Sequence, residues 1–238
     1  MLMLHAGADP IDYDGLKALP VPRATETHHP IPFHYLVDMV RHMLQFYHHE
    51  VVQEDFGVTK DSARFFGLMT LKSHYGEYTD FLALRSSTDK SMSAALSYGS
   101  RVFICDNMAI RGDFIIRRKN TVNARHEMPS LISKLVEPLQ AKREAQHERL
   151  LAYKATDLSE RDARDTIVRL YEEDVINVQR IPTVLEQWKN PQHEEWARGK
   201  VWTLFNACTW ALKGQVLANP SATTKLHDVL DGICEHVH

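Results

Sequence analysis

A thiol stands beside two polar side chains in "SRVFICDN", residues 100–107. Cys105 could serve there as a nucleophile, because an activated thiol can attack an electrophilic substrate atom. The alternative is a strand that ends on a small buried cysteine and is followed by a turn at Asp106 and Asn107. We favour the strand, since the sequence identifies no histidine that would act as the base for Cys105.

Histidine is frequent, with 14 residues in the chain and several of them in the first 50. His42 and His49 are seven positions apart, so both could lie on one helical face as metal ligands. Only Glu50 and Asp55 accompany them, and the three cysteines form no C-x-x-C pair. We therefore predict no metal site and no cofactor.

Motifs of the common nucleotide-dependent and hydrolytic enzymes do not occur in the sequence. The glycine patterns G-x-G-x-x-G and G-x-x-x-x-G-K-[ST] are missing, which argues against a nucleotide-driven enzyme of a common type. G-x-S-x-G and H-E-x-x-H are missing as well. We expect a protein that acts by binding rather than by catalysis.

Positive charge gathers between residues 101 and 125. This segment carries a net charge of +4 in a chain whose total is −3, so the remainder carries −7. Aromatic residues interleaved with basic ones on a sheet are typical of proteins that hold single-stranded nucleic acid. The alternative is a solvated strand edge whose charges discourage edge-to-edge pairing. With the neighbouring basic and aromatic positions, the candidate nucleic-acid contacts are Arg85, Lys90, Tyr98, Arg101, Phe103, Arg111, Arg117, Arg118, Lys119 and Arg125.

Short strand patterns must position this basic segment. Runs rich in aromatic and β-branched residues predict strands at 51–58, 63–71, 80–86, 100–107 and 113–119. Too few residues separate them for crossover helices, so we expect antiparallel neighbours. The intervening "KSMSAALSYG", residues 90–99, could form one short helix.

Helical periodicity flanks the strand patterns on both sides. Residues 33–49 have the apolar spacing of an amphipathic helix, whereas residues 1–32, rich in Pro, Gly, Asp and His, predict an irregular lead-in. A long helix is expected from Met128-Pro129 through residue 154, and Asp157 or Ser159 should cap the next one. The prediction is an α+β fold, with an antiparallel sheet in residues 33–126 and a helical region in 127–238, together forming one compact domain.

Three scattered cysteines fit a reducing compartment. The apolar start of the chain is too short for a signal peptide, and no run approaches the 18 apolar residues of a membrane span. We therefore predict a cytoplasmic protein without membrane contact.

The stretch "LALRSSTDKSMSAALSYGSRVFICDN", residues 82–107, resembles the signature of a phage- and plasmid-borne family known as domain of unknown function 932. Farther on, "VWTLFNACTWALKG" is similar to that family's closing motif, and the resemblance runs from about residue 60 to 215. The chain departs from the pattern at Ser86, where the family has Asn, and at Lys90, where it has Gly. The residues that match are Ser87, Asp89, Ser91, Arg101, Val102, Cys105, Asn107, Trp202 and Asn206.

The resemblance implies a protein of a mobile element, and many such proteins take part in replication and recombination. Together with the basic segment, it leads to the hypothesis of a protein that binds and anneals single-stranded DNA, with the helical half forming a homo-oligomer interface. Two alternatives stay open. One is a stoichiometric inhibitor that binds a host defence protein, and the other is an enzyme that uses Cys105 or a histidine-bound metal.

Overall fold

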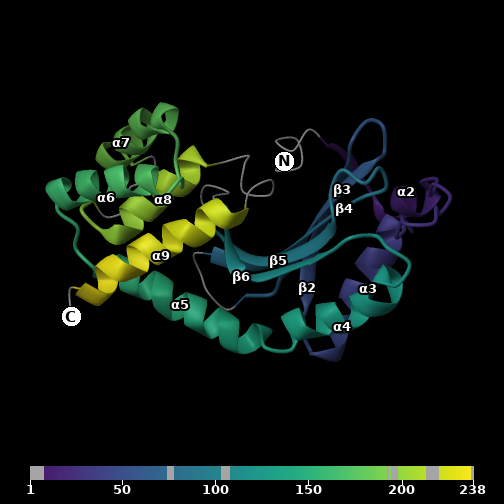
Figure 1. Ribbon diagram of the computed structural model, residues 1–238. Coiled ribbons are helices and arrows are strands. Elements are labelled where there is room, and N and C mark those ends of the chain that lie inside the picture. The colour runs from purple at the N-terminus through teal and green to yellow at the C-terminus, as the bar shows by residue number, and fades with distance from the viewer. Residues whose placement is uncertain are drawn as a thin grey trace. The chain divides into compact units, whose positions relative to one another are not determined.

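The computed structural model describes residues 8–73, 78–102, 108–191, 193, 198–212 and 220–236, with the backbone alone for residues 78, 101–102, 108–115, 220 and 236. A six-stranded antiparallel sheet occupies the N-terminal half and helices fill the C-terminal half, which confirms the predicted α+β class (Figure 1). The chain divides into two compact units. The first comprises Met1–Ser100 and Asp113–Leu139, and the second comprises Arg101–Gly112 and Gln140–His238.

The sheet is a meander in which each strand pairs with its neighbours in chain order. In the register of the central strands, Phe56 pairs with Gly67 and Phe65 pairs with Ser86. The strands are β1 (Asp9–Ile11), β2 (Val51–Val58), β3 (Arg64–Leu71), β4 (Tyr78–Ser87), β5 (Ala94–Val102) and β6 (Met108–Arg118).

Helices pack against one face of this sheet (Figure 1). The side chains buried between the helices and the sheet form the core of the first unit. The helices are α2 (Tyr13–Ala18), α3 (Phe33–Phe46) and α4 (Ala124–Val136). The ring of Phe33 on α3 stacks on that of Phe65 on β3, with centroids 5.3 Å apart. Gly67 makes room for this contact, because a Cβ at that position would come within 2.9 Å of the Phe65 ring. The aromatic strand residues thus fix where α3 lies on the sheet.

Two local differences from the sequence-based prediction have clear causes. The expected irregular lead-in contains β1 and α2, and α2 begins where the Asp12 carboxylate accepts a hydrogen bond from the Gly15 N–H. The segment that could have been a short helix begins the strand β5. Ala94, Leu96 and Tyr98 alternate into the core, which is the period of a strand.

Helices make up most of the second unit. They are α5 (Leu139–Ala155), α6 (Glu160–Glu172), η1 (Val178–Arg180), α7 (Ile181–Lys189), α8 (Val201–Ala211) and α9 (Pro220–His236). Ser159 caps α6 as expected, since its hydroxyl accepts from the Asp162 N–H at 3.1 Å. The prediction of a single long helix from Met128 through residue 154 was wrong. It is divided into α4 and α5 at Pro138, which has no N–H to donate to the carbonyl of Lys134.

A buried polar cluster joins α5 to α9 within the second unit. The Tyr153 hydroxyl donates to the Asp231 carboxylate at 2.6 Å and lies 3.1 Å from His227 Nδ1. Burial and the negative charge of Asp231 raise the pKa of Tyr153 well above its usual value. The Asp231 carboxylate also pairs with Arg149 at 2.8 Å, so the cluster holds its charges in balance.

No helix in the described part of the chain is long and apolar enough to cross a membrane.

Candidate functional site

The loop between β4 and β5, residues 88–93, carries the first part of the motif that the sequence singles out. Ser87, the last residue of β4, closes this loop, because its hydroxyl donates to the Met92 carbonyl at 2.9 Å and accepts from the Met92 N–H at 3.0 Å. A strand residue therefore fixes both ends of a short loop at the edge of the core.

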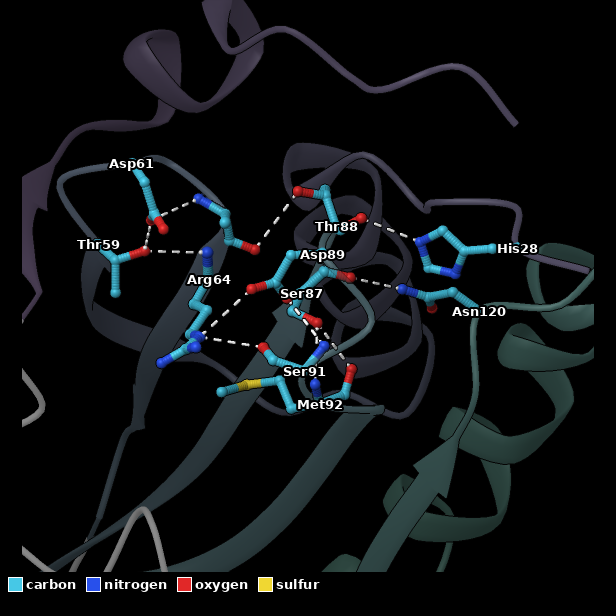
Figure 2. Close-up of polar contacts among 11 residues, drawn as sticks. His28, Thr59, Asp61, Arg64, Ser87, Thr88, Asp89, Ser91, Met92 and Asn120 are labelled. Atoms are coloured by element: carbon cyan, nitrogen blue, oxygen red, sulfur yellow. Dashed lines mark hydrogen bonds and ion pairs between the residues drawn. The ribbon is translucent and has the colours of Figure 1, made fainter. Parts of the chain in front are cut away.

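Asp89 organises the inside of the loop. Its carboxylate accepts from the Ser91 N–H at 2.9 Å and lies 3.6 Å from Arg64 Nε, which also donates to the Ser91 hydroxyl at 3.0 Å (Figure 2). The hydrogen bonds from Ser91 lower the pKa of Asp89 to about 2, and the positive charge of Arg64 adds to the effect. Asp89 is thus ionised at neutral pH, and its charge is already matched by Arg64.

Lys90, the next residue of the loop, has a backbone conformation that residues with a Cβ seldom adopt. Its φ is +68°, in the left-handed region that favours glycine, and its side chain is exposed. A residue with a Cβ costs about 1–2 kcal/mol in that region. The structure therefore holds a lysine at a position whose backbone conformation glycine adopts more easily.

Two more segments meet the loop from distant parts of the sequence. Asn120, just after β6, donates through its side-chain Nδ2 to the Ser87 carbonyl at 2.9 Å. Its backbone carbonyl accepts from the His29 N–H at 2.8 Å. The His28 ring places Nε2 3.0 Å from the Thr88 carbonyl (Figure 2). Because a carbonyl can only accept, the neutral His28 ring carries its proton on Nε2. All three segments belong to the first unit.

A cavity of about 400 Å³ lies where these segments meet. Four residues with hydroxyl groups and two lysines contribute to its wall, and among the described residues that line it none is acidic. The lining residues are Thr27, His28, Lys90, Ser91, Met92, Ser93, Lys119, Asn120 and Thr121. A hollow with two cations, several hydroxyl groups and no carboxylate suits an anion.

One buried polar atom behind the cavity wall, the Oδ1 of Asn120, has no hydrogen-bond partner among the described residues. Its orientation follows from Nδ2, which must face the Ser87 carbonyl in order to donate. Asn120 is only 5% exposed and its Oδ1 is fully buried, so its amide group holds the Ser87 carbonyl rather than contacting a molecule in the cavity.

The structure brings together some of the predicted site residues and separates others. Lys90 and Lys119, 29 positions apart, line one cavity, whose loop is built by Ser87, Asp89 and Ser91. Arg85 is half-buried on β4, and burial together with the positive charge of Arg117 lowers its pKa. Arg117 itself is exposed.

Two basic residues of the predicted set are already engaged. Arg118 donates to the Glu127 carboxylate at 2.6 Å, which ties the end of β6 to α4. The Arg125 guanidinium lies 4.1 Å from the centre of the Tyr35 ring, an arrangement that gives a cation–π contact. Both side chains therefore support α4, and the cations of the cavity are Lys90 and Lys119.

Tyr98 does not offer a stacking surface. It is fully buried in the core, and its hydroxyl donates to Asp80 at 2.8 Å, so the expectation that it stacks on a base was wrong. The alternation of β5 sends Tyr98 toward the helices rather than outward.

The rest of the motif has two different outcomes. Phe103, Cys105 and Asn107 lie outside the described residues, as do the side chains of Arg101 and Arg111. Trp202 and Asn206 are buried on α8, where Asn206 Nδ2 donates to the Trp202 carbonyl at 2.9 Å and the Trp202 ring stacks on Phe205. These two motif residues therefore pack the second unit and do not line the cavity.

Two observations on the described residues bear on the metal and thiol chemistry that the sequence raised. Among the described residues, no group of three or more His, Cys, Asp or Glu could hold a metal ion. The described cysteines, Cys208 and Cys234, are buried and not in a disulfide, and burial raises the pKa of each thiol. Neither thiol has the lowered pKa of an activated nucleophile.

Sequence reasoning missed several residues of the site, chiefly Arg64, Asn120 and Thr121. Asn120 follows the basic run directly, but nothing local indicates that its side chain would reach the Ser87 carbonyl 33 positions away. His28 was noted only as one of many histidines. Its signal was weak because its partner is a backbone carbonyl.

No protein-family model, curated protein or solved structure matches this chain.

Proposed function

We propose that this protein binds single-stranded nucleic acid through the phosphates of its backbone, at the cavity beside the β4–β5 loop. The observation that carries the proposal is that Lys90 and Lys119, from separate segments, line one cavity without an acidic neighbour in its described wall. Phosphates are the anions that such lysine and hydroxyl groups bind in nucleic-acid proteins. The choice of DNA as the strand is carried over from the sequence resemblance, for which no family model gives a match.

Charge balance around the cavity favours an anion from outside. Arg64 matches the nearest carboxylate, Asp89, and Glu127 matches Arg118. The ammonium groups of Lys90 and Lys119 are left to attract a ligand. The exposed Arg117 lies two residues before Lys119 and extends the positive surface along the end of β6.

A salt titration tests this proposal. A fluorescein-labelled oligothymidine of about 20 nucleotides is titrated with protein, and the fluorescence anisotropy is followed as salt is raised. The logarithm of the affinity should fall linearly with the logarithm of the salt concentration. The variant Lys90→Ala/Lys119→Ala should bind more weakly, with a slope shallower by about 1.4, because each phosphate contact on a single strand contributes about 0.7.

The matched control is Lys60→Ala/Lys134→Ala, which removes two exposed lysines of the same unit that do not line the cavity. This variant has the same net charge as the test variant and should keep the wild-type slope. Equal losses in both variants would mean that net charge, and not the cavity, drives binding. If wild type fails to bind at low salt, the proposal fails, and a protein partner becomes the next hypothesis.

A further inference from the structure

The wall of the cavity includes a histidine whose ring is held through one nitrogen. His28 Nε2 lies 3.0 Å from the Thr88 carbonyl, so the neutral ring carries its proton on Nε2 and a lone pair on Nδ1 (Figure 2). Nδ1 has no hydrogen-bond partner among the described residues, and it is not one of the polar atoms that are fully enclosed without one. This nitrogen therefore keeps contact with solvent, although the residue as a whole is only 9% exposed.

The turn that carries His28 fixes the position of the ring. The His28 N–H donates to the Thr25 hydroxyl at 3.2 Å, and the His28 carbonyl accepts from the Thr25 N–H at 2.8 Å. The next residue, His29, donates its N–H to the Asn120 carbonyl and so ties the turn to the segment after β6. These contacts hold His28 in the wall of the cavity independently of any ligand.

Protonation of His28 leaves all of these contacts in place. The imidazolium ring keeps its N–H at Nε2, which continues to donate to the Thr88 carbonyl, and it gains a second N–H at Nδ1. The change adds one positive charge and one charge-assisted donor to the wall that contains Lys90 and Lys119. Histidine is the side chain whose charge ordinarily changes between about pH 5 and 8, so the cavity can gain a third cation within that range.

The charges near the ring leave this third cation for a ligand. Lys90 and Lys119 are the other titratable residues among the described residues that line the cavity, and Asp89 in the loop already pairs with Arg64. A phosphate bound between the two lysines brings the negative charge that favours the protonated ring. The titratable residues on the three segments that meet at the cavity are Arg23, Glu26, His28 and His29, then Asp89 and Lys90, and then Arg117, Arg118 and Lys119.

We infer that His28 is a third ligand of the bound phosphate and that it engages only when its ring is protonated. Lys90 and Lys119 bind the phosphate throughout the range from about pH 5 to 8, and the Nδ1–H of the imidazolium donates to a phosphate oxygen in the acidic part of that range. The inference rests on the proposed function, because it takes the phosphate of a nucleic-acid strand as the ligand. It adds that the protein holds the strand more tightly in mildly acidic solution.

Anisotropy titrations of the whole chain at about pH 5.5 and about pH 8 test the inference. The probe is an oligothymidine without a terminal phosphate, labelled with a rhodamine whose fluorescence does not depend on pH. Its internal phosphodiesters keep their charge in this range, so a pH effect arises in the protein. Wild type should bind about tenfold more tightly at the lower pH, with a salt slope steeper by about 0.7.

The variant His28→Gln separates the charge of the ring from its structural role. The glutamine amide can donate to the Thr88 carbonyl but takes up no proton, so the variant should bind like wild type at about pH 8 and lose both gains at about pH 5.5. The matched control is His42→Gln, which removes an exposed histidine on α3 that does not line the cavity. This control should keep both gains. Equal losses in the two variants would mean that net charge causes the pH effect, and the inference would fail.

A measurement on wild type keeps the test independent of whether His28→Gln folds. Nitrogen-15 NMR of the histidine rings should show His28 protonated at Nε2 alone near pH 8 and, with the strand bound, at both nitrogens near pH 5.5. A ring that stays neutral in the complex near pH 5.5 overturns the inference. Strand binding that depends on Lys90 and Lys119 but gains nothing from His28 leaves the proposed function standing and sinks the inference. A strand that binds at neither pH sinks both.

Discussion

Replacing Lys90 by glycine should separate stability from binding. The lysine backbone lies at φ +68°, where a Cβ costs about 1–2 kcal/mol. Glycine relieves this cost but gives the unfolded chain more freedom, worth about 0.5–1 kcal/mol. The difference predicts that Lys90→Gly raises the free energy of unfolding by up to about 1.5 kcal/mol.

The same change should weaken binding. Lys90 lines the cavity with its exposed ammonium group, so its loss removes one phosphate contact and lowers the salt slope by about 0.7. A residue with a purely structural role would behave differently, since a more stable loop would bind equally well or better. A gain in stability with a loss in affinity is therefore the diagnostic result.

Urea denaturation followed by circular dichroism measures the stability, and a constant m-value shows that the unfolded state is unchanged. Lys90→Ala keeps the Cβ and its unfavourable backbone, so it should lose affinity without gaining stability. Ser62→Gly is the matched control. Its φ is +56° in the β2–β3 turn, away from the cavity wall, so it should gain stability and keep wild-type affinity.

The reasoning is refuted if Lys90→Gly binds like wild type, because Lys90 would then contact no phosphate. It is refuted equally if the variant loses more than about 1 kcal/mol of stability, because the left-handed backbone would then depend on lysine itself.

Three further predictions concern the surroundings of the cavity. Because the pKa of Asp89 is lowered to about 2 in the folded state, its contribution to stability is complete above about pH 4 and is lost as the pH falls toward 2. Urea titrations should show that Asp89→Asn is less stable than wild type by about 1 kcal/mol at neutral pH and equally stable near pH 2. A difference that stays constant with pH would contradict this. Arg117→Ala should lower the salt slope of oligothymidine binding by about 0.7, because Arg117 is exposed. Arg118→Ala should leave the slope unchanged, because Arg118 is paired with Glu127. Equal slopes for the two variants would show that this ion pair opens for the ligand. Tyr153→Phe removes a hydroxyl that donates to Asp231 in the second unit and should reduce the free energy of unfolding by about 1–3 kcal/mol. The affinity for oligothymidine should stay that of wild type, and a changed affinity would contradict the assignment of binding to the first unit.

Local patterns predicted the elements but not the contacts between them. The strand at 51–58 and the N-cap at Ser159 follow from β-branched spacing and from capping chemistry, and both were confirmed. The strand β5 was ambiguous because its small residues Ala94 and Ala95 favour neither period strongly. The break at Pro138 was missed because the apolar spacing of a helix continues on both sides of it.

The candidate site was harder to predict because three distant segments build it. Asn120 and His28 join the loop through the carbonyls of Ser87 and Thr88, and backbone carbonyls leave no mark on the sequence. Tyr98 was misplaced for a related reason. Its neighbours in sequence are polar, but the strand period turns it into the core.

The division of roles around the loop has a consequence for how substitutions should act. Ser87, Asp89 and Ser91 direct their hydrogen bonds to the loop and to Arg64 rather than to the cavity. They set the geometry that holds the ligand-facing Lys90 in its unfavourable backbone. Changes at these loop positions should therefore lower stability and binding together, whereas Lys90→Ala and Lys119→Ala should lower binding alone. A motif residue whose loss abolished binding in a fully stable protein would have to contact the ligand itself.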